Sequence, residues 1–421
     1  MSVKFIVVLC ILKCCFCEDI SDNNLTLIFK WNTLELKWPS KERKTQLMDE
    51  QKYIPENSFI RDFKLWKNWT YFTIPRWKKG IPITLARIPT ELNVLPTSPP
   101  LEPYPSWSMQ TLDDCFALQS VHSIDIDKDG QLWVLDSGMV EELRVNRTYC
   151  PPKLVIIDSN TSLIIKEAVI PANMKFNNSI LTTMALEREK QIVYVVDSNY
   201  YNSGFIVYEY QTGIFKRFLC EQLSPDEDSS NINYIPPNII PEFVSVSLNT
   251  ERDKLYFSTF DSSDLLYVNV SVFTRSVNDI SSFVVNLGKN GRSVKLISDS
   301  KGYMYFNIVN ERSVAQWRES SWVFQYTPHI VVQSKLLCHW ISSLDVDDEG
   351  YLWIVSNRFH DYSKDNFKLE KENIRIFRIY VPRKEKPKRP RTGFNAEYVV
   401  LILFLIIIGL IVIEILMFNT D

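Results

Sequence analysis

Histidine is scarce in this chain of 421 residues, which contains only four: His122, His329, His339 and His360. No two of them have the spacing of zinc ligands. The sequence also lacks a nucleophile elbow, a phosphate-binding glycine loop and a His-Glu-x-x-His motif. His122 and His339 each precede a similar stretch of sequence, which indicates a repeated structural position. We therefore predict no metal site and no cofactor, and we favour binding over catalysis.

An excess of one charge sign and sustained helical periodicity are missing as well. The 47 basic and 50 acidic residues give a net charge of −3, which provides no signal for a nucleic-acid partner. The 21 prolines and clustered turn residues interrupt the body of the chain at short intervals. We expect an all-β body; the sequence does not indicate an oligomeric state.

The first 17 residues have the layout of a secretory signal peptide. Lys4 precedes an apolar run from Phe5 to Leu12, a cysteine-rich cluster follows, and acidic residues begin at Glu18. Cleavage after Cys17 would deliver the rest of the chain to the secretory pathway.

A second apolar run, Tyr398–Phe418, contains one charged residue, Glu414. At about 1.5 Å per residue, a helix of this length spans a hydrocarbon layer of about 30 Å. We predict a transmembrane helix over 398–418, a basic and proline-rich stalk over 381–397, and a short tail over 419–421. The basic stalk alone would favour a cytosolic position, but a translocated body favours a single-pass type I protein at the cell surface. A GPI-anchored or a secreted form is the alternative.

Cysteines and glycosylation sequons agree with an oxidising compartment. Four of the eight cysteines fall within the signal peptide, and the other four are Cys115, Cys150, Cys220 and Cys338. An even number suggests two disulfides, with three possible connectivities. Six Asn-x-Ser/Thr sequons lie at Asn24, Asn68, Asn146, Asn160, Asn177 and Asn269.

The body, residues 18–380, contains a repeated unit of an alternating strand, a turn and a second strand with an aromatic anchor. Its clearest copies are Ser123–Asp136 and Ser343–Ser356. The anchors, 48 to 62 residues apart, are Phe72, Trp133, Tyr194, Tyr256, Tyr305 and Trp353. This spacing suits four-stranded blades, and we predict a six-bladed β-propeller. Leu25–Trp31 and Leu34–Trp38 are candidates for the strand that closes the ring.

One copy of the repeat has the spacing of calcium-loop ligands: Asp125, Asp127, Asp129 and Asp136, with Gly130 at the sixth position. Here the run joins two predicted strands and not two helices. We therefore favour a turn between blade strands, with calcium as the alternative.

Seven segments of this chain resemble the Yellow / major royal jelly protein family of arthropods over about residues 31–380. They are Ile74–Leu85, Leu101–Trp107, Asp129–Gly138, Cys150–Leu154, Gly204–Tyr208, Leu352–Arg358 and Asn373–Arg378. The resemblance implies a six-bladed propeller and the disulfides Cys115–Cys150 and Cys220–Cys338. By motif position it also implies an amine site at the mouth of the central channel, formed by Ser342, Asn357 and Phe359. Family roles include pigmentation, dopachrome conversion, nutrition and amine binding.

Two features depart from the family pattern. One is the transmembrane segment, and the other is the run Pro236–Pro241, which replaces a family segment bordering the channel. The leading hypothesis is a membrane-tethered propeller that binds a small aromatic amine or catechol. A dopachrome-converting isomerase is the enzymatic alternative, in which a histidine or carboxylate at the channel mouth moves a proton, although the sequence singles out none. A developmental or cuticle interaction protein without a small ligand is the third hypothesis.

Overall fold

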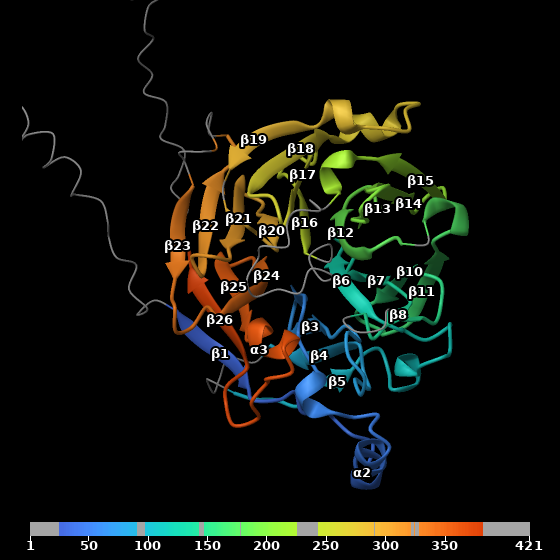
Figure 1. Cartoon of the computed structure of the whole chain (residues 1–421), viewed down its shortest axis with the longest axis vertical. Helices are drawn as coiled ribbons and strands as arrows, with labels where there is room; N and C mark the ends of the chain where they lie inside the picture. Colours follow the sequence, from blue (N-terminus) through green and yellow to red (C-terminus); the bar gives the residue numbers. More distant parts are fainter. Residues whose placement is uncertain are drawn as a thin grey trace, which may run out of the picture. The chain divides into compact units, whose positions relative to one another are not determined.

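The computed structural model describes residues 25–90, 97–142, 147–176, 178–224, 243–289, 291–320, 324 and 328–381. Six four-stranded antiparallel sheets follow one another around a ring within residues 1–380 (Figure 1). The first strand of each sheet contacts the first strand of the next, and the last sheet contacts the first. These six inner strands surround a central channel. The predicted six-bladed propeller is confirmed.

Each blade is named here by its position along the chain, and its strands run from the channel outward. Blade 1 contains β2 (Phe63–Trp66), β3 (Trp69–Thr73), β4 (Leu85–Pro89) and β5 (Glu102–Pro103). Blade 2 contains β6 (Val121–Ile126), β7 (Gln131–Asp136), β10 (Lys153–Asp158) and β11 (Ile164–Val169). Blade 3 contains β12 (Leu181–Glu187), β13 (Ile192–Asp197), β14 (Gly204–Glu209) and β15 (Ile214–Leu219).

The second half of the ring has the same plan. Blade 4 contains β16 (Val244–Leu248), β17 (Lys254–Thr259), β18 (Asp264–Asn269) and β19 (Val285–Lys289). Blade 5 contains β20 (Leu296–Ser298), β21 (Tyr303–Ile308), β22 (Ser313–Arg318) and β23 (His329–Gln333). Blade 6 contains β24 (Trp340–Val346), β25 (Tyr351–Asn357), β26 (Ile374–Tyr380) and β1 (Thr26–Trp31).

The ring is closed by the N-terminal strand, because β1 pairs antiparallel with β26 as the outer strand of blade 6. The first candidate closing strand, Leu25–Trp31, is therefore confirmed. The second candidate, Leu34–Trp38, is not a strand; Leu36 only bridges Leu101 in blade 1. Outside the sheets, α2 (Lys41–Asp49) follows this segment and α3 (Phe359–Ser363) follows β25, while β8 (Met139–Val140) pairs with β9 (Arg147–Thr148).

Most predicted aromatic anchors occupy equivalent positions in the blades. Trp133, Tyr194, Tyr256 and Trp353 are each the third residue of their blade's second strand, and each packs toward the following blade. The predicted anchor of blade 1, Phe72, is wrong by one residue. Tyr71 pairs with Lys64 and packs between blades 1 and 2, whereas Phe72 packs between blades 6 and 1. A shift of one residue along a strand moves a side chain to the other face of the sheet.

The aspartates of the repeat fix the turns between the first two strands. Asp127 accepts a hydrogen bond from the Trp133 indole nitrogen at 3.1 Å, and Asp347 accepts one from Trp353 at 2.7 Å. Asp127 also accepts from the backbone of Gln131 at the end of the turn. The run is therefore strand, turn and strand, as expected. Its carboxylates bond to the turn, to Gln191 and to the cations Lys64 and Arg188. No cluster of metal-binding side chains occurs in the described ranges.

Several expectations concern residues outside those ranges: the signal peptide at 1–17, Pro236–Pro241, most of the stalk, the helix at 398–418, and the sequons at Asn24, Asn146 and Asn177. Among the described helices, none is long and apolar enough to cross a membrane. The remaining sequon residues Asn68, Asn160 and Asn269 are exposed to solvent, as glycosylation requires.

Candidate functional site: one end of the channel and a side pocket

Charged side chains meet in the channel along the inner strands. Lys64 of β2 lies 3.1 Å from Asp345 of β24 and 3.7 Å from Asp125 of β6. Asp125 is also 2.9 Å from Arg188. Burial opposes the charge on Lys64, but the two carboxylates outweigh it and raise the pKa of the ammonium group. The charges in this part of the channel are therefore paired with one another.

A second pair lies nearer the beginning of the inner strands. Asp62 contacts Lys295 at 2.6 Å and accepts a hydrogen bond from the Ser343 hydroxyl at 2.5 Å. Burial alone would raise the pKa of Asp62, but the Lys295 ammonium group holds it below its usual value. Both members of this pair border a small cavity of about 20 Å³ on the channel axis.

The inner strands share a local irregularity at this end of the channel. The register of β6, β12 and β24 shifts at His122, Thr182 and Ser342, as expected for β-bulges. Arg61 donates hydrogen bonds to the carbonyl oxygens of His122 and Thr182, both at 2.6 Å. A bulge leaves backbone groups outside the ladder, and Arg61 supplies the missing donors for two blades.

The predicted site residues Ser342 and Asn357 meet at one backbone atom. The Ser342 hydroxyl and the Asn357 amide both donate to the carbonyl oxygen of Ile60, at 3.2 and 3.3 Å. Asn357 is 1% exposed, yet its Oδ1 atom has no hydrogen-bond partner within the described part of the chain. A buried amide oxygen without a donor costs free energy, which marks this atom as a position for a ligand donor.

The third predicted residue, Phe359, belongs to a buried group of rings, which we call the aromatic cap. Its members are Phe59, Trp77, Phe243, Phe260, Trp340, Phe359 and Tyr362. They lie at or near the ends of strands of blades 1, 4 and 6, and Phe59 and Phe243 line the axial cavity. Phe359 packs on Trp340 at 4.8 Å and on Phe243 at 5.1 Å between ring centroids. The cap leaves too little space in the cavity for an aromatic ligand unless a ring moves.

A buried acid lies beside the cap, and the sequence did not single it out. Glu142 contacts Nε2 of His122 at 2.9 Å and accepts hydrogen bonds from the hydroxyls of Ser120 and Ser137. Burial raises the pKa of Glu142 to about 8. Ser120 and Glu142 both contact the same nitrogen, Nε2. A serine-histidine-acid relay requires the two ring nitrogens separately, so this arrangement holds or moves a proton and does not activate a nucleophile.

The disulfide expectations have different outcomes. Cys115 and Cys150 are joined, as the family resemblance implied. The second pairing is wrong: Cys220 and Cys338 are both buried, and no disulfide joins them. Cys220 follows the outer strand of blade 3, whereas Cys338 precedes the inner strand of blade 6, across the ring. Disulfide formation requires Cα atoms within about 7 Å, which this placement does not allow.

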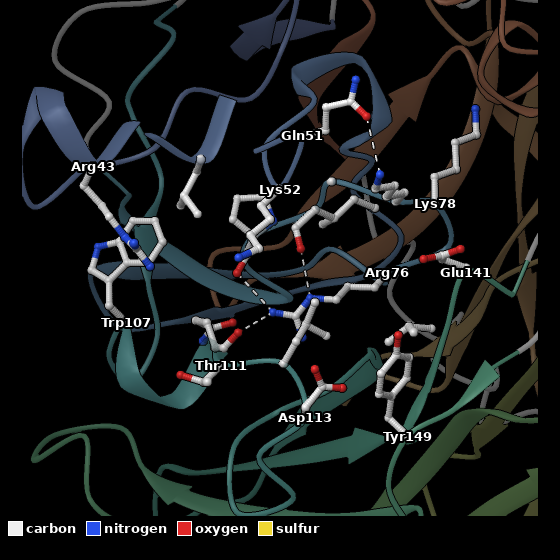
Figure 2. Close-up of a pocket in the computed structure, with 18 residues that line it drawn as sticks. Arg43, Gln51, Lys52, Arg76, Lys78, Trp107, Thr111, Asp113, Glu141 and Tyr149 are labelled. Atoms are coloured by element: carbon white, nitrogen blue, oxygen red, sulfur yellow. Dashed lines mark hydrogen bonds between the residues drawn. The ribbon is translucent and has the colours of Figure 1, made fainter. Parts of the chain in front are cut away.

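A larger cavity, the side pocket, lies away from the channel and has a volume of 390 Å³. Its walls come from α2 with the turn after it, residues 78–82, residues 107–113, residues 140–141 and Tyr149 (Figure 2). Sequence reasoning missed it because five separate segments contribute one or a few residues each. Only two of these segments, residues 107–113 and Tyr149, adjoin the Cys115–Cys150 pair in the sequence.

The fold defines the class of this protein: a six-bladed β-propeller closed by its N-terminal strand. The family is defined by sequence, since the family model described as Major royal jelly protein matches residues 119–389, more than half of the chain. The chain belongs to the major royal jelly protein family, which includes the Yellow proteins.

Relatives at moderate identity cover most of the chain. Major royal jelly protein 1 of Apis mellifera is 26% identical over 409 residues, which span 89% of this chain and 93% of that protein. Protein yellow of Drosophila erecta is 26% identical over 367 residues, which span 81% and 67%.

Solved structures with this general arrangement are more distant. A luciferin-regenerating enzyme has a TM-score of 0.46 at 9% identity and covers 85% of this chain and 95% of its own. Virginiamycin B lyase of Staphylococcus aureus has a TM-score of 0.42 at 11% identity, with coverage of 77% and 96%.

Proposed function

We propose that this chain is an extracellular, membrane-tethered propeller that binds a small aromatic amine or catechol beneath the aromatic cap. The observation that carries the proposal is the buried Oδ1 atom of Asn357, which has no hydrogen-bond donor among the residues that the structure describes. Asn357 ends β25, two residues before Phe359 begins α3. An ammonium group is a strong donor for that oxygen, and the rings of the cap offer faces to a cation. The indole nitrogens of Trp77 and Trp340 are also buried, have no acceptor among the described residues, and provide donors for ligand hydroxyls.

Binding at this position requires the cap to open. The existing cavity of about 20 Å³ holds no more than a water molecule. Phe359 begins the five-residue helix α3, and a shift of this short helix moves Phe359 and Tyr362 together. The neighbouring cations do not oppose an ammonium group strongly, because Lys295 is paired with Asp62 and Arg61 is bonded to carbonyl oxygens. We expect slow association that saturates with ligand concentration, as when opening precedes binding.

Calorimetry of the purified full-length chain with serotonin and dopamine tests the proposal. We expect binding at micromolar concentrations, weakened about tenfold or more by Asn357→Leu, which removes the acceptor. Asn366→Leu is the matched control, because Asn366 is exposed and lies outside the cap. The absence of heat at high micromolar ligand would contradict the proposal and favour an interaction protein without a small ligand.

A second candidate function is dopachrome conversion, and the pair formed by Glu142 and His122 favours it. A carboxyl group with a pKa of about 8 can both donate and accept a proton near neutral pH. We expect accelerated decay of dopachrome, lost in Glu142→Gln and retained in Glu349→Gln, an exposed control. Decay no faster than in buffer would eliminate this activity.

The tether is proposed from residues 398–418. Membrane fractions extracted with alkaline carbonate should retain the full chain, and deletion of 398–418 should release the propeller into the medium. Release of the intact chain by a phospholipase specific for GPI anchors would contradict the type I arrangement.

A further inference from the structure

The side pocket has a floor that the protein holds rigidly. Arg76 lies beneath it, 2% exposed, and its guanidinium group donates to five backbone carbonyl oxygens. These belong to Ile81, Pro82, Gln110, Leu118 and Gln119. Two of the segments that line the pocket are thereby fixed to one side chain. The pocket is preformed, which lowers the entropic cost of binding.

The walls are formed by tight turns in uncommon backbone conformations. Gln51, Asp113 and Glu141 have positive φ angles of 52°, 66° and 54°, and Gly80 has 78°. All four line the pocket. At Gly80 a Cβ atom would lie 2.5 Å from Ile54, so no other residue fits without displacement. Left-handed backbone in non-glycine residues is uncommon and concentrates at functional sites.

The two sides of the pocket carry opposite charge. Arg43, Lys52 and Lys79 lie on the side formed by α2 and the Lys78–Gly80 turn, and all three are exposed. Asp113 and Glu141 lie on the other side, and neither forms an ion pair in the described ranges. Figure 2 shows Arg43 and Lys52 on one side of the Arg76 side chain and Asp113 on the other. The Cys115–Cys150 disulfide ties the segment that carries Asp113 to that of Tyr149.

Apolar surface remains uncovered between these charges. Leu112 is 42% exposed and Tyr149 is 38% exposed, and both line the pocket together with Trp107. The volume of 390 Å³ is within the range of small-molecule sites, about 300–1,000 Å³. A ligand for this pocket therefore has an apolar or aromatic body, an anionic end and a cationic end.

We propose that the side pocket binds a small zwitterion with an apolar body, namely a free amino acid with an aromatic or large aliphatic side chain. Its carboxylate lies toward Lys79 and Arg43, and its ammonium group lies toward Asp113 and Glu141. Lys79 is the available cation, since the only hydrogen bond of its ammonium group to a described residue is a long one of 3.4 Å to Gln51. Lys52, by contrast, pairs with Glu50 at 2.7 Å.

Calorimetry of the full-length chain with L-phenylalanine and two matched analogues tests this proposal. Phenethylamine lacks the carboxylate, and 3-phenylpropionate lacks the ammonium group. We expect L-phenylalanine to bind at least threefold more tightly than either analogue, because each loses one partly exposed ion pair. All titrations are repeated in Asn357→Leu, so that binding of an amine in the channel is measured separately.

Two substitutions test which side of the pocket holds the carboxylate and which holds the ammonium group. Lys79→Gln should weaken the binding of phenylalanine and phenylpropionate about three- to fivefold and leave the binding of phenethylamine unchanged. Asp113→Asn should weaken phenylalanine and phenethylamine and leave phenylpropionate unchanged; asparagine tolerates the positive φ of this position. Lys335→Gln and Asp348→Asn, both exposed and outside the pocket, are the matched controls.

The proposal is overturned if L-phenylalanine does not bind at millimolar concentration, or if phenylpropionate binds as tightly as phenylalanine. It is also overturned if Lys79→Gln and Asp113→Asn change nothing. A loss of the same binding in Asn357→Leu would place the ligand in the channel instead.

Discussion

The capped end of the channel and the side pocket are built in opposite ways. In the channel Asp62, Lys64, Asp125 and Asp345 are largely buried and paired, and the aromatic cap closes the space above them. In the side pocket the charges of Lys79 and Asp113 are exposed, and the space is already open. The channel site must rearrange to admit a ligand, whereas the side pocket needs only to exchange water. We therefore expect slow, selective binding in the channel and fast, weaker binding at the side.

The largest effect is expected where the side pocket depends on one buried group. Arg76→Met leaves five carbonyl oxygens without their donor and should lower the free energy of unfolding by about 4 kcal/mol. Urea unfolding measures the change. Arg43→Met, at the exposed edge of the same pocket, should change stability by less than about 0.5 kcal/mol. Equal costs for the two variants would show that the floor of the pocket is not held by Arg76.

The channel end should show a distinctive pH dependence. Folding raises the pKa of Glu142 from 4.5 to about 8, so the native chain keeps a proton that the unfolded chain releases. Stability should therefore fall as pH rises from about 5 to 8, by roughly 3 kcal/mol from this group. Glu142→Gln should flatten that part of the stability curve, and Glu349→Gln should not. An unchanged slope in Glu142→Gln would mean that this carboxyl group is ionised in the folded chain.

Removal of the Cys115–Cys150 disulfide should affect the side pocket but not the channel site. Replacing Cys115 and Cys150 together by alanine should cost about 2–3 kcal/mol, because the pair closes a loop of 35 residues. The same change should weaken phenylalanine binding in the side pocket and leave serotonin binding in the channel intact. Cys220→Ala with Cys338→Ala should leave both affinities unchanged and lower stability only through a small loss of packing. Loss of serotonin binding in the Cys115/Cys150 variant would show that the two regions are coupled.

The smallest effect concerns the turn between β6 and β7, which lines neither region. Asp127→Asn weakens the hydrogen bond to Trp133 and those to the turn backbone, and should cost about 1 kcal/mol. Asp129→Asn, exposed in the same turn, should be neutral. The loss of melting temperature caused by Asp127→Asn should be the same in calcium and in a chelator. A calcium-dependent melting temperature lost in Asp127→Asn would revive the calcium interpretation.

Repetition explains what the sequence could predict. The blade repeat, its aromatic anchors and the closing strand depend on local alternation, which is visible residue by residue. Phe72 failed because blade 1 has neighbouring aromatic residues, Tyr71 and Phe72, and local pattern cannot decide which faces the next blade. The channel residues Ser342, Asn357 and Phe359 were found through family motifs. Only the fold shows that Ser342 and Asn357 meet at the Ile60 carbonyl and that Phe359 belongs to the cap.

Other features depend on contacts between distant segments. The Glu142–His122 pair joins residues 20 apart, and the side pocket joins five segments without a common motif. The erroneous Cys220–Cys338 pairing came from the resemblance and not from geometry. Only the ring of blades shows that these cysteines lie far apart.

The most direct test is a crystal structure of the chain soaked with serotonin and L-phenylalanine together. We predict serotonin beneath a displaced Phe359, with its ammonium group on Asn357 Oδ1, and phenylalanine between Lys79 and Asp113. Density for neither ligand, or both ligands in the same site, would contradict the account.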